Sequence, residues 1–406
     1  MMSTKNCFCE DFPLKIQSTL DCLIRDGICA GASIAIGRFG KQVVRCDSGW
    51  ENLETQKSIS DRTWFQMFSL TKPVTAVAIM QLYEKGYFVL TDPISKFLPA
   101  YKDMYVRHVR ANGDEVLVPA ERAITIHDLL TMTSGVVYSG TGLIGEKLDR
   151  LSEEMACSKG TDYELGTLDY INRLAQVPLQ FEPSAQYEYG LGLDVLGALV
   201  EVCSGKRLDH YVQDHIFSPL GMKSATFLLA EAKKHDLAVS YAQNKEGGLK
   251  REDLTGTAAI NAYTQNNTKY ISGGSGLICT LDDYFQFAKM LANGGRTDTG
   301  EVILGEKTLK LMSTPKLTQT QLQSFARDGD TCLHATGYSY GYGVHVRTEP
   351  GTHLPVGEWG WAGTMGTWMS IDPVNELFWV YAHQMVPGNF EAHIPQLSKL
   401  IYDSIR

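Results

Sequence analysis

Segments with the pattern of β-strands lie at both ends of this chain, and the segments between them have the pattern of helices. Alternating runs at 33–36 and 42–46, joined by a glycine-bearing turn at 38–40, predict a hairpin near the start. Further strands are predicted at 342–347, 366–371 and 377–382. Helical spacing of apolar residues predicts helices at 12–28, 69–86, 126–132, 168–175, 194–204, 208–216, 281–292 and 394–405.

This order of elements predicts an α+β fold with two parts. One sheet, formed from residues 1–65 and 256–406 and flanked by the terminal helices, makes the first part because strands from both ends bury their apolar faces most simply together. A mainly helical domain of residues 66–255, inserted between the two halves of the sheet, makes the second. A chain of 406 residues that is 44% hydrophobic and 20% charged can bury such a core.

The charge and composition of the chain exclude several partners. A formal net charge of −9 leaves no excess of lysine and arginine for a polyanion, so we expect no nucleic acid partner. The first residues lack the pattern of a secretory signal, and no apolar run reaches the roughly 18 residues of a membrane helix. We therefore expect a cytoplasmic protein with no membrane partner. The nine cysteines lack zinc-ligand spacing, so we expect reduced thiols, no metal and no cofactor.

Ser69 and Lys72 stand three residues apart at the start of the strongest predicted helix. This spacing puts the hydroxyl and the amine on one face, within reach of each other. A serine hydroxyl becomes an effective nucleophile when a neighbouring base takes its proton, and a desolvated lysine amine can do this. The helix N-terminus adds free N–H groups that suit an oxyanion. The alternative is a helix cap with Lys72 on a solvated face, although apolar neighbours such as Phe68 and Val74 make a surface lysine unusual there.

Other candidate nucleophiles and bases have weaker patterns. Ser313 and Lys316 have the same spacing, but Pro315 between them disrupts a continuing helix and predicts a loop. Ser275 follows two glycines, yet its segment lacks the closing glycine of a nucleophile elbow, so we interpret it as a tight loop. His383, at the exit of a predicted strand, is interpreted as a packed or cleft-lining residue and not as a base.

Tyr189 offers a second basic group. It lies in a glycine-bearing loop just before a predicted helix, and a phenol near an ammonium ion can act as a general base. Tyr187 and Tyr170 are its rivals. Each of the three could instead be a core aromatic residue with a satisfied hydroxyl group.

Trp361, Ala362 and Gly363 form the third element, which is predicted at the entry to a strand. Small residues there would let backbone N–H groups approach a substrate carbonyl closely. The alternative is an ordinary aromatic-rich edge strand.

Taken together and in order, these motifs resemble those of the class C β-lactamase-like serine hydrolases, which include penicillin-binding proteins. The matching segments are Phe68-Ser69-Leu70-Thr71-Lys72-Pro73, Ile124-Thr125-Ile126-His127-Asp128-Leu129-Leu130-Thr131-Met132-Thr133-Ser134-Gly135, Tyr187-Glu188-Tyr189 and Trp361-Ala362-Gly363. Within that superfamily the chain is most similar to the family VIII carboxylesterases and the related acyltransferases. The resemblance spans residues 20 to 400, and the ordered set is far more specific than any one motif.

The resemblance implies a function for each motif. It implies that Ser69 forms an acyl-enzyme, that Lys72 and Tyr189 share the general-base role, and that the backbone N–H groups of Ser69 and Thr364 form the oxyanion hole. It also implies the fold expected from the patterning, an antiparallel sheet with terminal helices and an inserted all-α domain, with the active site in the cleft between the two parts.

Two departures from the family's pattern bear on the substrate. Trp361 stands where β-lactamases and penicillin-binding proteins typically have a lysine that holds a substrate carboxylate. Leu191 stands where the tyrosine motif normally has an asparagine that contacts a substrate amide. Both changes favour neutral esters. We expect Trp361, Ala362, Gly363, Tyr187 and Leu191 to line the substrate site.

The leading hypothesis is therefore an esterase that acts on a small-molecule ester or amide through acylation of Ser69. Three alternatives stay open: a β-lactamase or D-Ala-D-Ala peptidase, an acyltransferase to an alcohol or amine, and a non-catalytic binding protein of the same fold. The natural substrate depends on cleft-lining loops, which we expect at 136–162 and 316–335. The sequence leaves the oligomeric state open.

Overall fold

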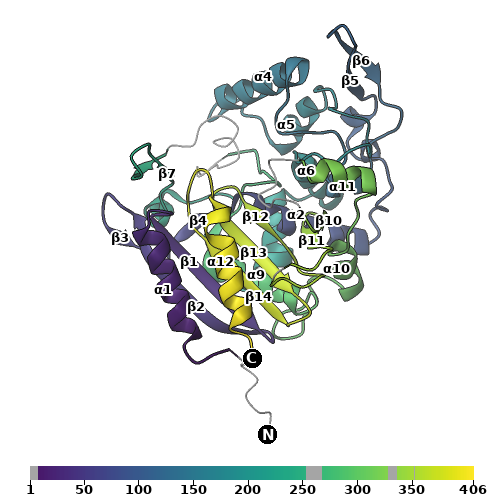
Figure 1. Ribbon diagram of the computed structural model, residues 1–406. Helices are drawn as coiled ribbons and strands as arrows, with labels where there is room; N and C mark the ends of the chain where they lie inside the picture. The colour runs from purple at the N-terminus through teal and green to yellow at the C-terminus, as the bar shows by residue number, and fades with distance from the viewer. Residues whose placement is uncertain (1–7, 253–267, 328–335, 352) are drawn as a thin grey trace.

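An eight-stranded antiparallel sheet takes its strands from both ends of the chain. The computed structural model describes residues 8–252, 268–327, 336–351 and 353–406. The order of strands in the sheet is β10-β11-β12-β13-β14-β1-β2-β3 (Figure 1). Their bounds are β1 Gly31–Arg38, β2 Lys41–Asn52, β3 Lys57–Ser58, β10 Tyr338–Tyr340, β11 His345–Arg347, β12 Trp359–Gly363, β13 Thr367–Asp372 and β14 Leu377–Ala382. The pairing of β14 with β1 joins the two ends of the chain in one sheet.

Helices cover both faces of this sheet, which explains why its central strands are continuously apolar. Helices α1 (Phe12–Arg25) and α12 (Phe390–Asp403) lie side by side on one face, and α9 (Leu281–Ala292) packs on the other (Figure 1). Alternate residues of β14 serve the two faces: Trp379 packs in the cluster of the terminal helices, and the Phe378 ring lies 5.0 Å from that of Phe285 in α9.

The elements outside this sheet are mainly helical, and among them residues Thr71 to Leu82 of α2 (Thr71–Glu84) are all buried. The other helices are α3 Ile126–Leu130, α4 Gly142–Ser158, α5 Thr167–Leu174, α6 Gly192–Ser204, α7 Leu208–Val212, α10 Glu306–Met312 and α11 Gln319–Phe325, with a π-turn at Gln213–Phe217. Short 3₁₀ turns lie at Phe68–Leu70, Ile94–Lys96, Pro99–Tyr101 and Glu231–Asp236. Three two-stranded sheets complete the described fold: β4 Trp64–Gln66 with β9 Ile278–Thr280, β5 Tyr105–Val109 with β6 Glu115–Pro119, and β7 Tyr241–Gln243 with β8 Leu249–Arg251.

Two segments that we expected to be loops contain helices. Residues 142–158 of the predicted loop 136–162 form α4, which buries Ile144, Leu148, Leu151 and Met155 at helical spacing. Glycines at the start of this segment hide the pattern. In the second expected loop, 316–335, residues 319–327 contain α11, and residues 328–335 lie outside the described residues.

Within the described ranges, no helix combines the length and the hydropathy that crossing a bilayer requires. The division into a sheet domain of residues 1–65 and 256–406 and a helical domain of residues 66–255 stays a prediction.

Candidate active site

Ser69 lies on the tight 3₁₀ turn, Phe68–Leu70, that leads into α2. The residue before it, Phe68, has a φ of +46°, a left-handed conformation that a bulky side chain adopts only under strain from its surroundings. Ser69 is 9% exposed, and Lys72 is fully buried in the first turn of α2. The Lys72 Nζ lies 3.0 Å from the Ser69 Oγ. This burial excludes the alternative in which Lys72 occupies a solvated face.

Lys72 also contacts a hydroxyl group and a carbonyl oxygen. Its Nζ lies 2.8 Å from the Tyr138 hydroxyl group and 2.9 Å from the Gly274 carbonyl oxygen. The carbonyl oxygen can only accept, so one N–H of Lys72 is committed to Gly274. The two hydroxyl groups can donate or accept. The same geometry therefore suits an ammonium that donates three hydrogen bonds and a neutral amine that accepts one from Ser69.

Two tyrosine rings enclose the Lys72 amine. Their centres lie 4.6 Å (Tyr189) and 5.2 Å (Tyr138) from Nζ, and 5.5 Å from each other. A close backbone contact brings their loops together: a Cβ on Gly190 would lie 2.0 Å from the carbonyl oxygen of Val136, so only glycine fits. The Tyr189 ring thus lies beside the amine, and its share in the general-base role stays a prediction.

Tyr138 is a site residue that sequence reasoning missed. It comes three residues after the matched segment that ends at Gly135, so the signal was an aromatic residue shortly after a family motif. Burial, followed by the negative charge of Asp194, raises the pKa of Tyr138 well above its ordinary value. Its hydroxyl group therefore keeps its proton and acts as a hydrogen-bonding partner of Lys72, and the role of base falls to other groups.

Asp194 in α6 fixes the loop that supplies the Gly274 carbonyl group. Its Oδ1 accepts hydrogen bonds from the Tyr270 hydroxyl group at 3.0 Å, the Ser272 hydroxyl group at 2.6 Å and the Gly274 N–H at 3.1 Å. A Cβ on Gly274 would lie 2.3 Å from the Asp194 Oδ2, so this loop needs glycine for its close approach. The glycine-rich loop is therefore a support for Lys72. Ser275 in it is buried and bonds to Ser272.

Trp361 lies in the middle of β12 and not at the strand entry as predicted, because the strand that follows the turn at 356–357 already begins at Trp359. Its indole Nε1–H donates to the Tyr189 hydroxyl group over 3.3 Å, and the two rings are 5.5 Å apart. The Trp361 side chain thus orients Tyr189. Ala362 points to the opposite face, where it packs in the cluster of α1 and α12, so only its backbone can serve the site.

Gly363, at the end of β12, brings the predicted oxyanion donor beside the nucleophile turn. A Cβ on Gly363 would lie 2.2 Å from the Met67 carbonyl oxygen and 2.2 Å from the Thr367 Oγ1. The Thr367 hydroxyl group itself donates to the Met67 carbonyl oxygen at 3.0 Å. Thr364 follows in an exposed turn. Strand β12 therefore packs by its backbone against the turn that carries Ser69.

Several candidate residues lie behind the site or away from it. Tyr187 and Leu191 are each 2% exposed in the hydrophobic core, where the Tyr187 ring packs 4.8 Å from Phe325, and their contact with substrate stays a prediction. The Tyr170 ring packs 4.8 Å from that of Tyr270. His383 is fully buried. Ser313 directly follows α10 and its hydroxyl group donates to the Leu309 carbonyl oxygen, which agrees with a structural role.

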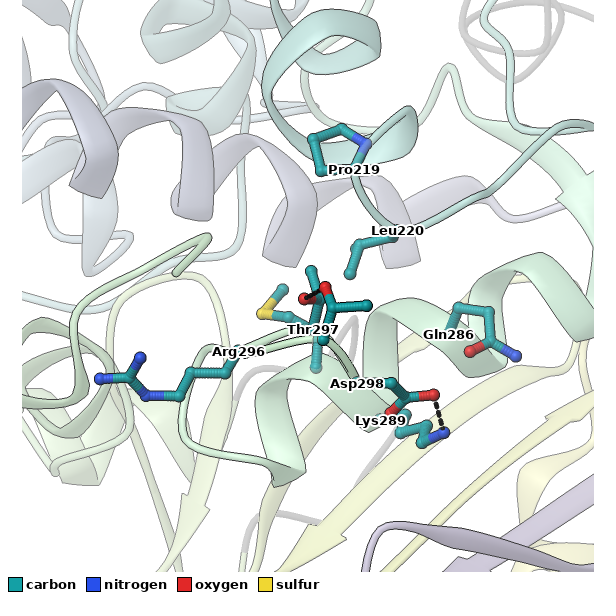
Figure 2. A pocket seen from close by; sticks show the side chains of 9 residues that line it. Pro219, Leu220, Gln286, Lys289, Arg296, Thr297 and Asp298 are labelled. Atoms are coloured by element: carbon teal, nitrogen blue, oxygen red, sulfur yellow. Dashed lines mark hydrogen bonds and ion pairs between the residues drawn. The ribbon is translucent and has the colours of Figure 1, made fainter. Parts of the chain in front are cut away.

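A separate small pocket lies between Leu220, α9 and the turn at 296–299 (Figure 2). It measures about 120 Å³, and the Lys289–Asp298 ion pair lies at its edge. None of the residues that line it belongs to the predicted motifs. In the part of the chain that the structure describes, no group of three or more His, Cys, Asp or Glu side chains is placed to hold a metal ion.

Comparison with known proteins matches the Beta-lactamase family profile to residues 16–400. The chain belongs to the beta-lactamase family. Esterase EstB of Burkholderia gladioli is 31% identical over 293 residues, which cover 69% of this chain and 70% of that protein. Acyltransferase calJ of Penicillium decumbens is 26% identical over 390 residues, which cover 91% of this chain and 86% of that protein.

Solved structures give the same fold. EstCE1, described as a hydrolase with promiscuous acyltransferase activity, superposes with a TM-score of 0.79 at 23% identity, covering 97% of this chain and 99% of that chain. The family match and this likeness confirm the predicted resemblance to β-lactamase-like serine hydrolases and the predicted fold.

Proposed function

We propose that this protein cleaves carboxylic esters through an acyl-enzyme on Ser69. The observation that carries the proposal is the buried Lys72 amine, 3.0 Å from the Ser69 hydroxyl group and enclosed by Tyr138 and Tyr189. A buried amine at hydrogen-bonding distance from a serine that follows the strained residue Phe68 is an arrangement that activates a nucleophile. The similarity to the esterase EstB supports the same reaction.

The proton of Ser69 has a defined route. In the neutral amine, two N–H groups donate to Gly274 and Tyr138, and the lone pair accepts the Ser69 hydroxyl hydrogen. As the Ser69 Oγ bonds to the acyl carbon, this proton passes to Nζ, and the ammonium then donates from all three positions. Tyr189 lies beside the ammonium and relays the proton to the departing alcohol oxygen, which leaves as the alcohol. Water then repeats the sequence on the acyl-enzyme.

The negative charge on the acyl oxygen is stabilised by backbone donors. The N–H groups of Ser69 and Thr364 form the oxyanion hole in this proposal, because β12 packs directly against the nucleophile turn at Gly363. Preorganised donors of this kind contribute about 10²- to 10³-fold each to kcat.

The substrate is a neutral ester. Position 361 carries an indole ring that is engaged with Tyr189, and its N–H is the only polar group that this side chain offers. An indole ring supplies no charge for a substrate carboxylate, which weakens recognition of β-lactams and of D-Ala-D-Ala peptides.

The test uses short p-nitrophenyl esters and a fluorophosphonate label. Wild type turns over the ester and gains one adduct on Ser69, whereas Ser69→Ala loses both. Ser313→Ala, at a serine with the same spacing to a lysine but outside the proposed chemistry, serves as the matched control and keeps both. Turnover in Ser69→Ala equal to that of wild type refutes the proposal, and a wild type without adduct or turnover favours a non-catalytic binding protein.

Acyl transfer is the second candidate, because the acyltransferase calJ aligns over 91% of this chain. An added alcohol or amine that raises the formation of acylated product above hydrolysis would establish it. Turnover of nitrocefin at the rate of the esters would instead support β-lactamase activity. The cytoplasmic location stays a prediction.

A further inference from the structure

His383, the first residue after β14, is held by hydrogen bonds at both ring nitrogens although it is fully buried. Its Nδ1 lies 2.9 Å from the Tyr381 hydroxyl group and its Nε2 lies 2.9 Å from the Gly388 carbonyl oxygen. A carbonyl oxygen only accepts, so Nε2 carries the hydrogen and Nδ1 accepts from Tyr381. The contacts therefore select one neutral tautomer.

The groups around His383 agree with this assignment. Since the Tyr381 hydrogen points to His383, the Cys29 thiol, 4.0 Å from the Tyr381 oxygen, is the donor of that contact. The neighbouring His393 ring, 4.6 Å away, donates from Nδ1 to the Asn389 carbonyl oxygen at 2.8 Å. Burial lowers the pKa of His383 well below its ordinary value and raises that of Tyr381 well above its own. All these groups are thus uncharged.

The His383 ring and Gly388 are in direct contact with the turn between β12 and β13. A Cβ on Gly366 would lie 1.7 Å from the His383 Nε2, so the ring packs flush on this turn. A Cβ on Gly388 would lie 2.6 Å from the Gly366 nitrogen and 2.7 Å from the Thr364 carbonyl oxygen. The Met385 N–H also donates to the Met365 carbonyl oxygen at 3.0 Å. The segment 383–388 therefore packs against residues 364–366 and fixes their position.

We propose that His383 is a positioning residue for ester cleavage: its Nε2–H holds the Gly388 carbonyl group, and Gly388 holds the turn that presents the Thr364 N–H to the acyl oxygen. The inference rests on the proposed function, because it needs Thr364 as an oxyanion donor. His383 touches no substrate. It acts on the transition state by fixing the position of the turn and so of the Thr364 N–H. Loss of His383 therefore lowers kcat and leaves KM nearly unchanged.

Two amide substitutions separate this role from simple packing. In His383→Gln the amide nitrogen reaches the position of Nε2 and can still donate to Gly388. In His383→Asn it reaches only the position of Nδ1, and the Gly388 carbonyl group loses its donor. Leu397→Ala, in the buried layer of α12, serves as the control for lost stability without contact to the turn.

The experiment measures kcat and KM for p-nitrophenyl acetate, the rate of fluorophosphonate labelling of Ser69, and Tm. We expect His383→Asn to lose at least about tenfold in kcat and in labelling rate with KM within about threefold, part of the about 10²- to 10³-fold that a lost oxyanion donor costs. His383→Gln keeps wild-type rates within about threefold. Leu397→Ala lowers Tm and keeps kcat.

A folded His383→Asn with wild-type rates, a loss confined to KM, or a His383→Gln as slow as His383→Asn overturns the positioning role. If His383→Asn does not fold, Gly366→Ala tests the same contact from the side of the turn, and wild-type kcat in that folded variant overturns the role as well. A wild type that neither labels nor hydrolyses ester overturns the proposed function itself, and the role of His383 with it.

Discussion

Replacing Gly363 with alanine tests the geometry on which the oxyanion side of the site depends. The added methyl group would lie 2.2 Å from the Met67 carbonyl oxygen and from the Thr367 Oγ1. Neither neighbour yields easily, because the first is backbone of the nucleophile turn and the second is hydrogen-bonded to it at 3.0 Å. Raising the contact from 2.2 Å to 3.0 Å, below which Cβ contacts essentially never occur, moves β12 away from Met67 by at least about 0.8 Å.

This displacement predicts the size of the loss. A misplacement of about 1 Å at a catalytic group can cost about 10²-fold in rate, and a lost oxyanion donor costs about 10²- to 10³-fold. We therefore expect kcat/KM for p-nitrophenyl acetate to fall about 10²-fold in Gly363→Ala, which corresponds to about 2.7 kcal/mol of transition-state stabilisation. Most of the loss lies in kcat, because the oxyanion forms only after the ester has bound.

Gly166→Ala is the matched control. Its Cβ would meet its nearest neighbour, Asp169, at 3.5 Å, which is ordinary van der Waals contact, so its rates should equal those of wild type. Circular dichroism and Tm establish that both variants fold. A folded Gly363→Ala with kcat within about threefold of wild type would refute the reasoning, since β12 would then have no part in positioning the oxyanion donor.

Three further predictions concern single groups. Trp361→Phe removes the N–H that donates to Tyr189 and keeps the ring, so kcat/KM for a p-nitrophenyl ester should fall about tenfold, and an unchanged value would contradict the role. Tyr138→Phe removes a partner of the Lys72 amine at 2.8 Å, and the same assay should show a loss of about 10- to 100-fold, whereas equal rates would exclude that role. Burial lowers the pKa of His393 from 6.5 to about 4. Between these pH values the unfolded chain therefore binds more protons than the folded chain. The free energy of unfolding should then fall by about 3 kcal/mol as the pH drops through this window. Urea unfolding at about pH 7 and about pH 4.5 should show a smaller pH effect in His393→Gln, and an identical pH effect would refute this.

Much of the fold could be predicted because its signals are periodic. The helix predicted at 281–292 matches α9, and the strand predicted at 377–382 matches β14, since each carries an uninterrupted apolar pattern. Helix α4 was hidden because three glycines lie in the segment 140–145, although its buried residues repeat at helical spacing. The hairpin of β5 and β6 escaped prediction because exposed apolar residues such as Val109 and Leu117 blur its alternation.

The candidate site could be predicted where both contacting residues belong to one sequence motif. Ser69 and Lys72 lie on adjoining turns, so their spacing alone indicated contact. Tyr138 and Gly274 could not be found in this way, because they reach Lys72 from loops 66 and 202 residues away in the sequence. The strand entry was placed at Trp361 instead of Trp359 because glycines lie before, within and after this segment, and a glycine pattern does not say where a turn ends and a strand begins.

The replacement of lysine by Trp361 affects both halves of the proposed chemistry. In the proposed chemistry, strand β12 has two roles. The Trp361 side chain donates a hydrogen bond to Tyr189, the proposed base, and the backbone after Gly363 supplies a donor to the oxyanion. A lysine at position 361 would place a second positive charge near a phenol that already lies 4.6 Å, centre to Nζ, from the Lys72 amine, and like charges would oppose the proton that Lys72 must accept. The indole N–H orients Tyr189 without that charge. Trp361 thus orients the proposed base and removes the attraction for a substrate carboxylate, which supports the proposal of a neutral ester.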